Sequence, residues 1–165
     1  MKIIKIRYLH IVFIVLVIYL YSCTPPGYIK TKELIFFDDR REDIVKTAKM
    51  FAGSLYKEGG TSPSGFDCSG FTQYVYEKNE YNIPRKASEQ YYSGRRIRLK
   101  SAKPGDLVFF RINSNRISHV GVYTGNFTFI HSPSSGKQVS FSSIKNPYWE
   151  RRYVGSVTYF RVSDF

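Results

Sequence analysis

Cysteine and histidine are scarce in this chain: its 165 residues include two cysteines and three histidines. Two cysteines allow at most one disulfide, which excludes a disulfide-rich scaffold. The chain has no Cys-x-x-Cys pattern and no His-Glu-x-x-His pattern. One cysteine and two histidines could still supply three zinc ligands, but without such a pattern we expect no metal site. Internal repeats and low-complexity tracts are also missing from the sequence.

Long hydrophobic runs are rare as well, and the longest one lies near the N-terminus. It extends from Tyr8 to Tyr21 and is interrupted only by His10. A helix that crosses a membrane needs ~20 apolar residues, so this run of 14 suits the core of a signal peptide better. The residues before it include three basic ones and no acid. We therefore expect residues 1–22 to be a signal peptide, with an uncleaved membrane anchor as the alternative. Either would export the domain.

The segment Leu20-Tyr21-Ser22-Cys23 resembles a bacterial lipobox, a motif whose cysteine is diacylated before the signal is removed. Tyr21 is bulkier than the usual residue at its position. The resemblance implies a lipid on Cys23, and two acyl chains would hold the protein firmly to a membrane. Because Thr24 follows instead of an aspartate, the enterobacterial sorting rule implies the outer membrane, with the domain facing the periplasm. An ordinary signal peptide with an incidental cysteine is the alternative.

Acidic residues are outnumbered: there are 13 of them against 25 lysines and arginines, and the formal net charge is +12. A basic surplus raises nucleic acid as a partner. The basic residues are dispersed, however, and an exported protein meets little nucleic acid, so we expect no nucleic-acid partner. Carboxylate-bearing cell-wall peptides and anionic lipid head groups are better candidates for the counter-charge. A generally solvated basic surface is the alternative.

The spacing of apolar residues predicts helices in the first half of the domain. Residues 23–38 contain Pro25-Pro26 and little periodicity, and we interpret them as the lipidated cysteine and a tether. Residues 39–165 are long enough for one domain with its own core. Apolar spacings of three and four predict three helices with a glycine-rich loop after the first. The expected helices are Arg40–Tyr56, Cys68–Lys78 and Ser88–Tyr92, and the expected loop is Lys57–Gly65.

Short β-branched and aromatic runs follow Pro104-Gly105-Asp106 and predict strands in the second half. Gly125-Asn126, between two of these runs, predicts a tight hairpin turn. Helices first and antiparallel strands second is the order of an α+β fold. The expected strands are Leu107–Phe110, Ser118–Tyr123, Phe127–His131, Gln138–Phe141 and Tyr153–Arg161.

Cys68 is the candidate nucleophile. It stands in Gly65-Phe66-Asp67-Cys68-Ser69-Gly70 at the expected start of a helix, where backbone N–H groups and the helix dipole favour a thiolate. The same N–H groups could serve as oxyanion donors. If Cys23 carries lipid, Cys68 is an unpaired thiol in an oxidising compartment. A disulfide between the two cysteines is the alternative, although it would tether a flexible tail to the middle of the domain.

Two histidines follow, on the two strands of the expected hairpin. His119 lies in an alternating strand, and His131 ends the next one. Cross-strand neighbours lie ~5 Å apart, so the ring of His131 could hydrogen-bond His119 and fix its tautomer. We predict Cys68 as nucleophile, His119 as general base and His131 as the orienting residue. Taken singly, either histidine could instead be a core or loop residue.

Together these pieces resemble the NlpC-type cysteine peptidases, papain-like endopeptidases of bacterial peptidoglycan. The resemblance covers roughly residues 44–160 and implies a papain-like α+β fold, in which N-terminal helices pack on a central antiparallel sheet of about five to six strands. It also implies Cys68, His119 and His131 as the catalytic set, and no cofactor. The matching pieces are Tyr56-Lys57-Glu58-Gly59-Gly60, Gly65-Phe66-Asp67-Cys68-Ser69-Gly70, Ile83-Pro84-Arg85, Pro104-Gly105-Asp106-Leu107-Val108-Phe109-Phe110, Ile117-Ser118-His119-Val120-Gly121-Val122-Tyr123 and Phe129-Ile130-His131.

The resemblance places four further residues at the substrate. Tyr56 matches a tyrosine that lines the active site, where its hydroxyl can reach the substrate or the developing oxyanion. Asp67 and Ser69 match positions beside the cysteine that help to bind the stem peptide. Arg85 matches a recurrent arginine, whose role is either to support the fold or to meet a carboxylate.

The implied function is that of a lipid-anchored, monomeric peptidoglycan hydrolase of the cell envelope. It would cleave the γ-D-glutamyl–diamino acid bond of stem peptides through a thioester on Cys68. Some members of the family instead cut the D-Ala–diaminopimelate cross-link, which is the first alternative. A wall-binding lipoprotein without turnover is a second alternative, against which the intact cysteine and histidine set argues. A thiol acyltransferase or amidase on the same scaffold is a third.

Overall fold

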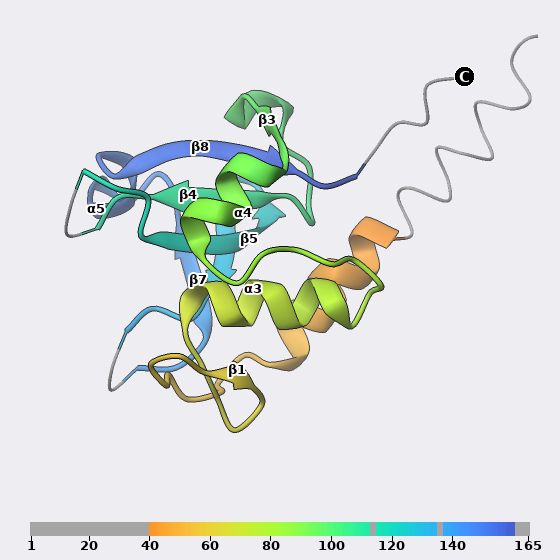
Figure 1. Cartoon of the computed structure of the whole chain (residues 1–165). Helices are drawn as coiled ribbons and strands as arrows, with labels where there is room; N and C mark the ends of the chain where they lie inside the picture. The colour runs from red at the N-terminus through yellow and green to blue at the C-terminus, as the bar shows by residue number, and fades with distance from the viewer. Residues whose placement is uncertain (1–39, 113–114, 135–136, 161–165) are drawn as a thin grey trace, which may run out of the picture. The chain divides into compact units, whose positions relative to one another are not determined.

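Six antiparallel strands form the central sheet of the computed structural model (Figure 1). The structure describes residues 40–112, 115–134 and 137–160. The predicted signal peptide (1–22), and the predicted lipidated Cys23 with its tether (23–38), lie outside the described residues. The strands lie side by side in the order β3-β8-β4-β5-β6-β7. They are β3 (Arg95–Ile97), β4 (Leu107–Phe110), β5 (His119–Gly125), β6 (Thr128–His131), β7 (Ser140–Ser143) and β8 (Tyr153–Thr158).

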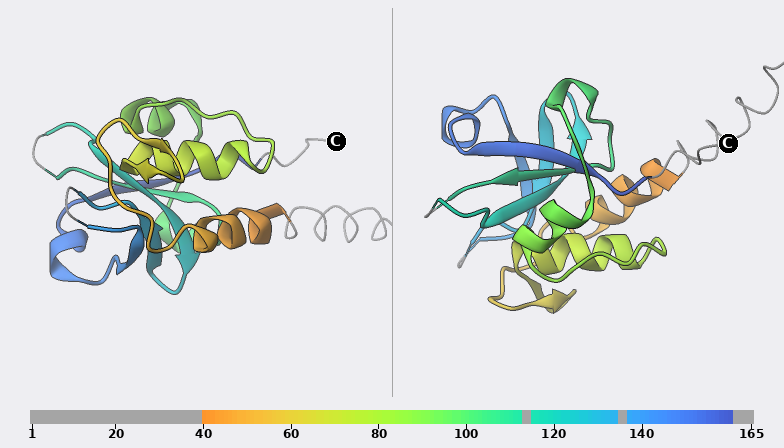
Figure 2. Two further views of the ribbon diagram at one scale, coloured as in Figure 1. Left: turned by 90° about the horizontal axis from the view of Figure 1, so that it is seen from below. Right: turned by 45° about the horizontal axis from the view of Figure 1, so that its top comes forward.

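Helices cover both faces of this sheet. The first described helix runs from residue 40 to residue 50, and it packs in one core with α3 (Cys68–Glu77) on one face. The short helix α5 (Pro147–Glu150) lies on the opposite face, as the left view of Figure 2 shows. Helix α4 (Ala87–Ser93) contacts the edge strand β3, and a 3₁₀ turn follows at Leu99–Ser101.

The residues of strand β4 explain why helices pack on both faces of the sheet. All four of its residues are buried. Leu107 and Phe109 belong to the larger core on the α3 side, whereas Val108 and Phe110 belong to a smaller core that includes Trp149 of α5. Successive side chains of a strand point to opposite faces, so a strand that is apolar throughout must be covered twice. The sheet is therefore the middle layer of three.

The first helix is shorter than the apolar spacing predicts, since it ends at residue 50 and not at Tyr56. Gly53 has a φ of +87°, a left-handed conformation that glycine adopts at little cost after a helix end. Its N–H donates to Val139 O (2.8 Å), and Tyr56 then forms a parallel bridge with Phe66. Backbone pairing with distant segments thus overrides the local helical pattern.

The predicted loop at Lys57–Gly65 is wrong in part, because it holds most of a small two-stranded sheet. Strand β1 (Thr61–Ser62) pairs with β2 (Gly65–Phe66) in antiparallel fashion. The hairpin turn predicted at Gly125-Asn126 is confirmed: the two residues between β5 and β6 are Asn126 and Phe127, with φ of +50° and +60°. Two successive positive φ values are what the tightest hairpins require.

All five predicted strands are present, although some ends differ. Strand β7 begins two residues later than predicted, at Ser140, and β8 ends at Thr158. The sequence pattern does not predict β3 or α5. Strand β3 begins with two arginines and lacks apolar alternation; it forms because its backbone pairs with β8. Helix α5 is a single turn, too short for a periodic signal.

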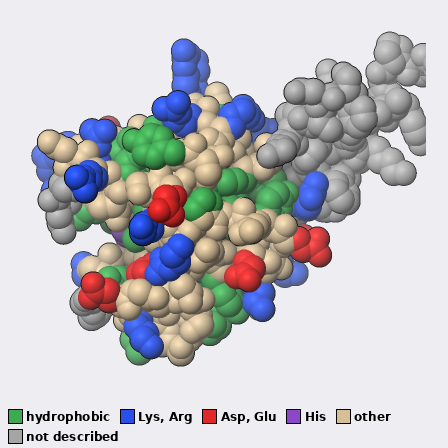
Figure 3. Space-filling view, in the orientation of Figure 1, with side chains coloured by type: hydrophobic (Ala, Val, Ile, Leu, Met, Phe, Trp, Pro, Cys, Tyr) green, Lys and Arg blue, Asp and Glu red, His purple; other side chains and the backbone are tan. Residues whose placement is uncertain are grey.

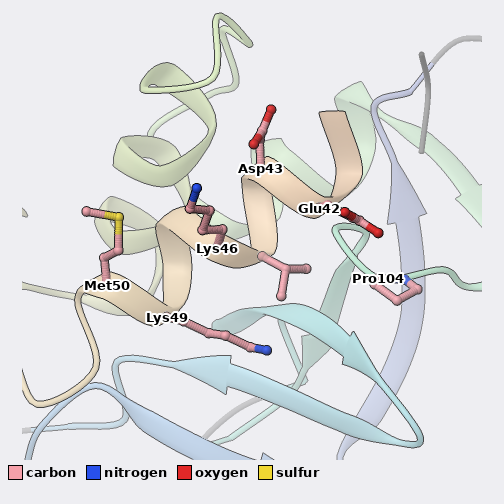
Figure 4. A pocket seen from close by; sticks show the side chains of 7 residues that line it. Glu42, Asp43, Lys46, Lys49, Met50 and Pro104 are labelled. Atoms are coloured by element: carbon pink, nitrogen blue, oxygen red, sulfur yellow. The ribbon is translucent and has the colours of Figure 1, made fainter. Parts of the chain in front are cut away.

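No predicted site residue lines either of two hollows on the described surface. The larger, of about 780 Å³, lies between charged residues of the first helix and Pro104 (Figure 4). The smaller, of about 500 Å³, lies beside the start of β8. Lysine and arginine side chains are scattered over the face shown in Figure 3. Within the described ranges, no helix is both long and apolar enough to span a bilayer.

Candidate active site

Cys68 opens helix α3, and its neighbours explain why the helix begins there. The Asp67 carboxylate accepts a hydrogen bond from Gly70 N (2.7 Å) and so caps the helix. Gly70 must be small, because a Cβ there would lie 2.0 Å from Gly60 O. That carbonyl is held in place by a hydrogen bond from Asp67 N (3.0 Å). Cys68 is a free thiol that keeps part of its surface accessible.

The sulfur lies against the start of strand β5. Cys68 Sγ is 3.7 Å from Ser118 O, the carbonyl that precedes His119. It also receives a backbone hydrogen bond from Val120, the residue that follows His119. These two contacts bracket His119 in the sequence. The packing of α3 on β5 therefore brings the thiol to the backbone of the predicted base.

The resting site holds a thiol and not a thiolate. Burial first, and the negative charge of Asp67 second, raise the pKa of Cys68 to about 11. Backbone hydrogen bonds from Val120, Ser69 and Cys68 itself lower this pKa. The helix start thus acts in the predicted direction, but burial outweighs it.

The two predicted histidines form a direct pair. His119 Nε2 lies 2.8 Å from His131 Nδ1, and the two side chains are only 4% and 1% exposed. The predicted contact between the two rings is thus present, although the two residues are not directly opposite each other across the strands. Val122 pairs with Ile130, and the residue facing His131 is Gly121, where a Cβ would lie 3.0 Å from His131 Cβ. The imidazoles are therefore diagonal neighbours across β5 and β6.

Aromatic rings enclose this pair. Trp149 of α5 stacks on His119 with ring centroids 5.3 Å apart and an interplanar angle of 27°. It also meets His131 edge-on, with centroids 4.9 Å apart. Burial lowers the pKa of His119 to about 4. Burial, followed by the charges of His119 and Lys137, lowers the pKa of His131 to about 2. Both imidazoles are thus neutral at physiological pH.

Sequence reasoning misses two residues of this cluster. Ser142 Oγ on strand β7 lies 3.0 Å from His131 Nε2 and extends the hydrogen-bonded chain by one link. Trp149 covers the imidazoles from the other side. Ser142 is one of several serines in its segment, and nothing in the pattern distinguishes it. Trp149 is the only tryptophan of the chain, which is a weak signal that could have drawn attention to it.

Asp67, Ser69 and Arg85 form one polar network beside Cys68. The Arg85 guanidinium pairs with both carboxylate oxygens of Asp67 and donates to Ser69 Oγ (2.9 Å). The hydrogen bond to Asp67 raises the pKa of Arg85. Arg85 therefore meets a carboxylate of the protein itself, and it also retains about a third of its surface (34%) for solvent.

Tyr56, the fourth predicted substrate residue, lies close enough to Cys68 for the two side chains to interact electrostatically. Its backbone N–H donates to Lys137 O (2.9 Å), and the bridge to Phe66 holds it close to the loop that leads to Cys68. Burial first, then the charges of Glu58, Cys68 and Asp67, raise the pKa of Tyr56. Its hydroxyl is therefore protonated and within electrostatic reach of the sulfur. The predicted Cys23 lies outside the described residues.

This arrangement suits acyl transfer. A partly accessible thiol contacts the backbone on both sides of His119, and the neutral His119 imidazole is hydrogen-bonded to His131. Nucleophilic catalysis by cysteine uses these three residue types. The His119 Nε2 atom faces His131, so Nδ1 is the nitrogen left to receive a proton from the thiol. Among the described residues, no group of three or more His, Cys, Asp or Glu side chains is placed to hold a metal ion.

Comparison with known proteins shows which sequences resemble this chain. Residues 53–158 match the family model described as NlpC/P60 family. LytE of Bacillus subtilis, a probable peptidoglycan endopeptidase, is 43% identical over 113 residues, which cover 68% of this chain and 33% of that protein. The probable endopeptidase NlpC homolog of Haemophilus influenzae is 44% identical over 114 residues, 68% of this chain and 60% of that protein.

Two further relatives differ in the bonds that their names specify. The γ-D-glutamyl-L-lysine dipeptidyl-peptidase of Bacillus subtilis is 39% identical over 112 residues, 67% of this chain and 38% of that protein. The murein DD-endopeptidase MepH of Escherichia coli is 44% identical over 109 residues, 63% of this chain and 40% of that protein. The chain therefore spans between a third and two fifths of the length of LytE and of these two relatives.

Solved structures confirm the predicted papain-like α+β fold. An NlpC/P60 family protein from Bacillus cereus has a TM-score of 0.69 at 35% identity, and the match covers 72% of this chain and 40% of that one. The NlpC/p60 domain of the peptidoglycan hydrolase SagA has a TM-score of 0.64 at 34% identity, with 72% of this chain and 97% of that one covered. That domain is thus matched over almost its entire length.

Proposed function

This chain is a member of the NlpC/P60 family, and from that membership and the geometry of the site we propose that it is a cysteine peptidase that cleaves peptidoglycan stem peptides. One observation carries the proposal. The Cys68 sulfur contacts the backbone on both sides of His119, and His119 is hydrogen-bonded to His131 (2.8 Å). The named activities of LytE and MepH support the same substrate class.

In the proposed reaction the thiol proton moves to His119 Nδ1 while Cys68 Sγ attacks the scissile carbonyl carbon. The tetrahedral intermediate then collapses, the C–N bond breaks, and His119 returns the proton to the departing amine. A thioester on Cys68 remains. Water, deprotonated by His119, attacks this thioester, and His119 returns that proton to the departing sulfur to restore the thiol. The carboxylic acid product then loses its own proton to solvent. Because the resting thiol and imidazole are both neutral, the thiol proton must move to His119 for the sulfur to attack.

Four residues are proposed to hold the stem peptide beside the sulfur. The Tyr56 hydroxyl, protonated and close to Cys68, can donate to the developing oxyanion. Asp67 and Ser69 flank the thiol, and Arg85 fixes both of them. The exposed part of the Arg85 guanidinium can meet a carboxylate of the stem. Asp67 and Arg85 compensate each other's charge, so the pair favours a zwitterionic ligand over a singly charged one.

The preferred bond is proposed to be that between D-glutamate, through its γ-carboxyl, and the diamino acid. The name of the relative from Bacillus subtilis specifies a γ-D-glutamyl-L-lysine bond, which supports this preference. The name of MepH specifies DD-endopeptidase activity, so the D-Ala–diaminopimelate cross-link is the second candidate.

The location of the protein is a separate proposal. We infer that residues 1–22 are a signal peptide and that lipidated Cys23 anchors a monomeric enzyme to the outer membrane, facing the periplasm. Mass spectrometry of the unaltered protein should then show an N-terminus at Cys23 that carries two acyl chains. Because the signal is removed only after acylation, Cys23→Ala should lack the acyl chains and retain residues 1–22. An unaltered protein whose Cys23 carries no acyl chain would contradict lipid anchoring.

Digestion of purified peptidoglycan by the full chain tests the activity. Mass spectrometry of the released muropeptides should show a new amine on the diamino acid and a free γ-carboxyl on D-glutamate. Cleavage of the cross-link would instead free the D-Ala carboxyl. Retention of the protein on the wall without release would indicate a binding protein, and acyl groups retained on an acceptor would indicate a transferase.

Cys68→Ala should abolish this release while the fold is retained, because the partly accessible sulfur serves the chemistry more than the packing. Cys23→Ala is the matched control, since it removes the other cysteine and should leave hydrolysis by the detergent-solubilised protein unchanged. Substantial release by Cys68→Ala would remove the thiol from the mechanism.

A further inference from the structure

Three side chains form a hydrogen-bonded line across strands β5, β6 and β7. His119 Nε2 lies 2.8 Å from His131 Nδ1, and His131 Nε2 lies 3.0 Å from Ser142 Oγ. The second link is diagonal, as the first one is. Ser140 pairs with His131, and Ser142 pairs with Phe129. Each hydrogen bond therefore joins residues that are offset by two positions from direct backbone pairing. The imidazole of His131 spans this offset because its two ring nitrogens lie on opposite sides of the ring.

The protons in this line have two possible arrangements when both imidazoles are neutral. In the first, His119 carries its proton on Nε2 and donates it to His131 Nδ1, and His131 Nε2–H donates to Ser142 Oγ. His119 Nδ1 is then bare and can accept the thiol proton. In the second, both hydrogen bonds run the other way, and His119 carries its proton on Nδ1, where it cannot act as a base toward Cys68.

The charged stage of the reaction permits only the first arrangement. Once His119 holds two protons, its Nε2–H must donate to His131 Nδ1, so the His131 proton must be on Nε2. The only acceptor that the described structure places at this nitrogen is Ser142 Oγ. His131 is 1% exposed, so without that oxygen an N–H group would be buried with no partner. Such an unpaired donor is costly.

We propose that Ser142 is a positioning residue that holds His131, and through it His119, in the tautomer able to accept the thiol proton. This proposal rests on the proposed function of Cys68 and His119, and it adds a residue that acts only through His131. Ser142 does not touch the sulfur or the site of attack. It works because its hydroxyl can accept the His131 Nε2–H hydrogen bond at both stages while remaining uncharged.

The test compares Ser142→Ala, Ser142→Thr and a matched control, Ser140→Ala, in the full chain. Ser140 lies on the same strand and pairs with His131 through the backbone, but its side chain is exposed. Selective ¹⁵N labelling of histidine reports by NMR which ring nitrogen carries the proton. Muropeptide release gives kcat and KM, and circular dichroism confirms that each variant is folded.

For the unaltered chain we expect the proton on Nε2 of both His119 and His131. Ser142→Ala should move part of the population to the opposite tautomer and lower kcat about tenfold with KM unchanged, because it leaves one buried hydrogen bond unmade. Ser142→Thr, which restores the hydroxyl, should recover both readouts. Ser140→Ala should change neither readout.

Unchanged ¹⁵N spectra in Ser142→Ala would overturn the proposal, whatever happens to kcat. So would a fall in kcat that Ser142→Thr does not recover although it folds. A chain that releases no muropeptide would contradict the proposed function instead. In that event the spectra alone still decide whether Ser142 sets the tautomers.

Discussion

The proposed nucleophile and the proposed base have different kinds of surroundings. Cys68 begins a helix amid a polar network in which Asp67 caps the helix and pairs with the partly exposed Arg85. His119 and His131 are enclosed by aromatic rings, and in the described structure neither imidazole forms an ion pair with an acidic side chain. Backbone hydrogen bonds and charges place the sulfur, whereas packing places the imidazoles.

This difference explains the resting protonation state. At the sulfur, burial and then the charge of Asp67 raise the thiol pKa, whereas hydrogen bonds from backbone N–H groups lower it. At His119 burial is the single influence, and it lowers the pKa to about 4. A base kept neutral by burial remains able to accept a proton in acidic surroundings. The four predictions below test this contrast between a polar half and an apolar half of the site.

The largest effect should come from removing the base. His119→Ala should lower kcat/KM of muropeptide release by about a thousandfold, because a general base contributes within the range of 10²–10⁴. His131→Asn keeps an amide that can accept from His119, and it should lose only about tenfold. Steady-state kinetics on one muropeptide measures both. Equal losses in the two variants would contradict the assigned division between base and orienting residue.

Acidification should reduce activity only at low pH. The base must be neutral, so kcat/KM should fall with a midpoint near 4, the pKa of His119, and not near the ordinary 6.5. Stability should also fall on acidification. Below pH 6.5 the histidines bind protons in the unfolded state but remain neutral in the folded state, so the free energy of unfolding decreases as pH falls toward 4. Rates and thermal melts recorded together separate the two effects. A midpoint near 6.5 in the folded protein would refute the claim that burial controls this base.

Removing the Trp149 ring, which covers His119, should destabilise the protein and change the pKa of His119. Trp149→Ala should cost roughly 2–4 kcal/mol of unfolding free energy, since a large aromatic is lost, and admitted water should raise the pKa of His119. Phe51→Ala is the matched control: its ring packs on Phe66 and Tyr74 in the other core. It should cost a similar amount and leave the pKa of His119 in place. Chemical denaturation and histidine NMR titration give both quantities, and equal pKa changes in the two variants would argue against a specific role of Trp149.

The smallest effects should come from the polar half, and they should have opposite signs. Asp67→Asn should cost less than about 1 kcal/mol, because asparagine also caps helices, and it should lower the pKa of Cys68 by removing a negative charge. Arg85→Gln should raise that pKa, because it leaves the Asp67 charge without its partner. The pH dependence of thiol alkylation measures both changes. Shifts in the same direction would show that charge does not control the thiol.

Local signals explain why part of this structure could be predicted. The capped start of α3 depends on Asp67, Cys68 and Gly70, which are consecutive or nearly so, and β4 can be read from four apolar residues. The hairpin that carries the two histidines has its own turn signal. The end of the first helix could not be predicted, because a hydrogen bond from Gly53 to Val139 decides it.

The sequence by itself determined the α+β order, the thiol at a helix start and the two imidazoles on adjacent strands, because these depend on short-range patterns of capping, periodicity and turns. Only the tertiary structure decided that Ser142 and Trp149 contact the imidazole pair, that the imidazoles meet on a diagonal and that burial raises the thiol pKa. These properties arise from burial and from contacts between segments that are distant in the chain. The local sequence around a residue does not specify which distant segments will bury it.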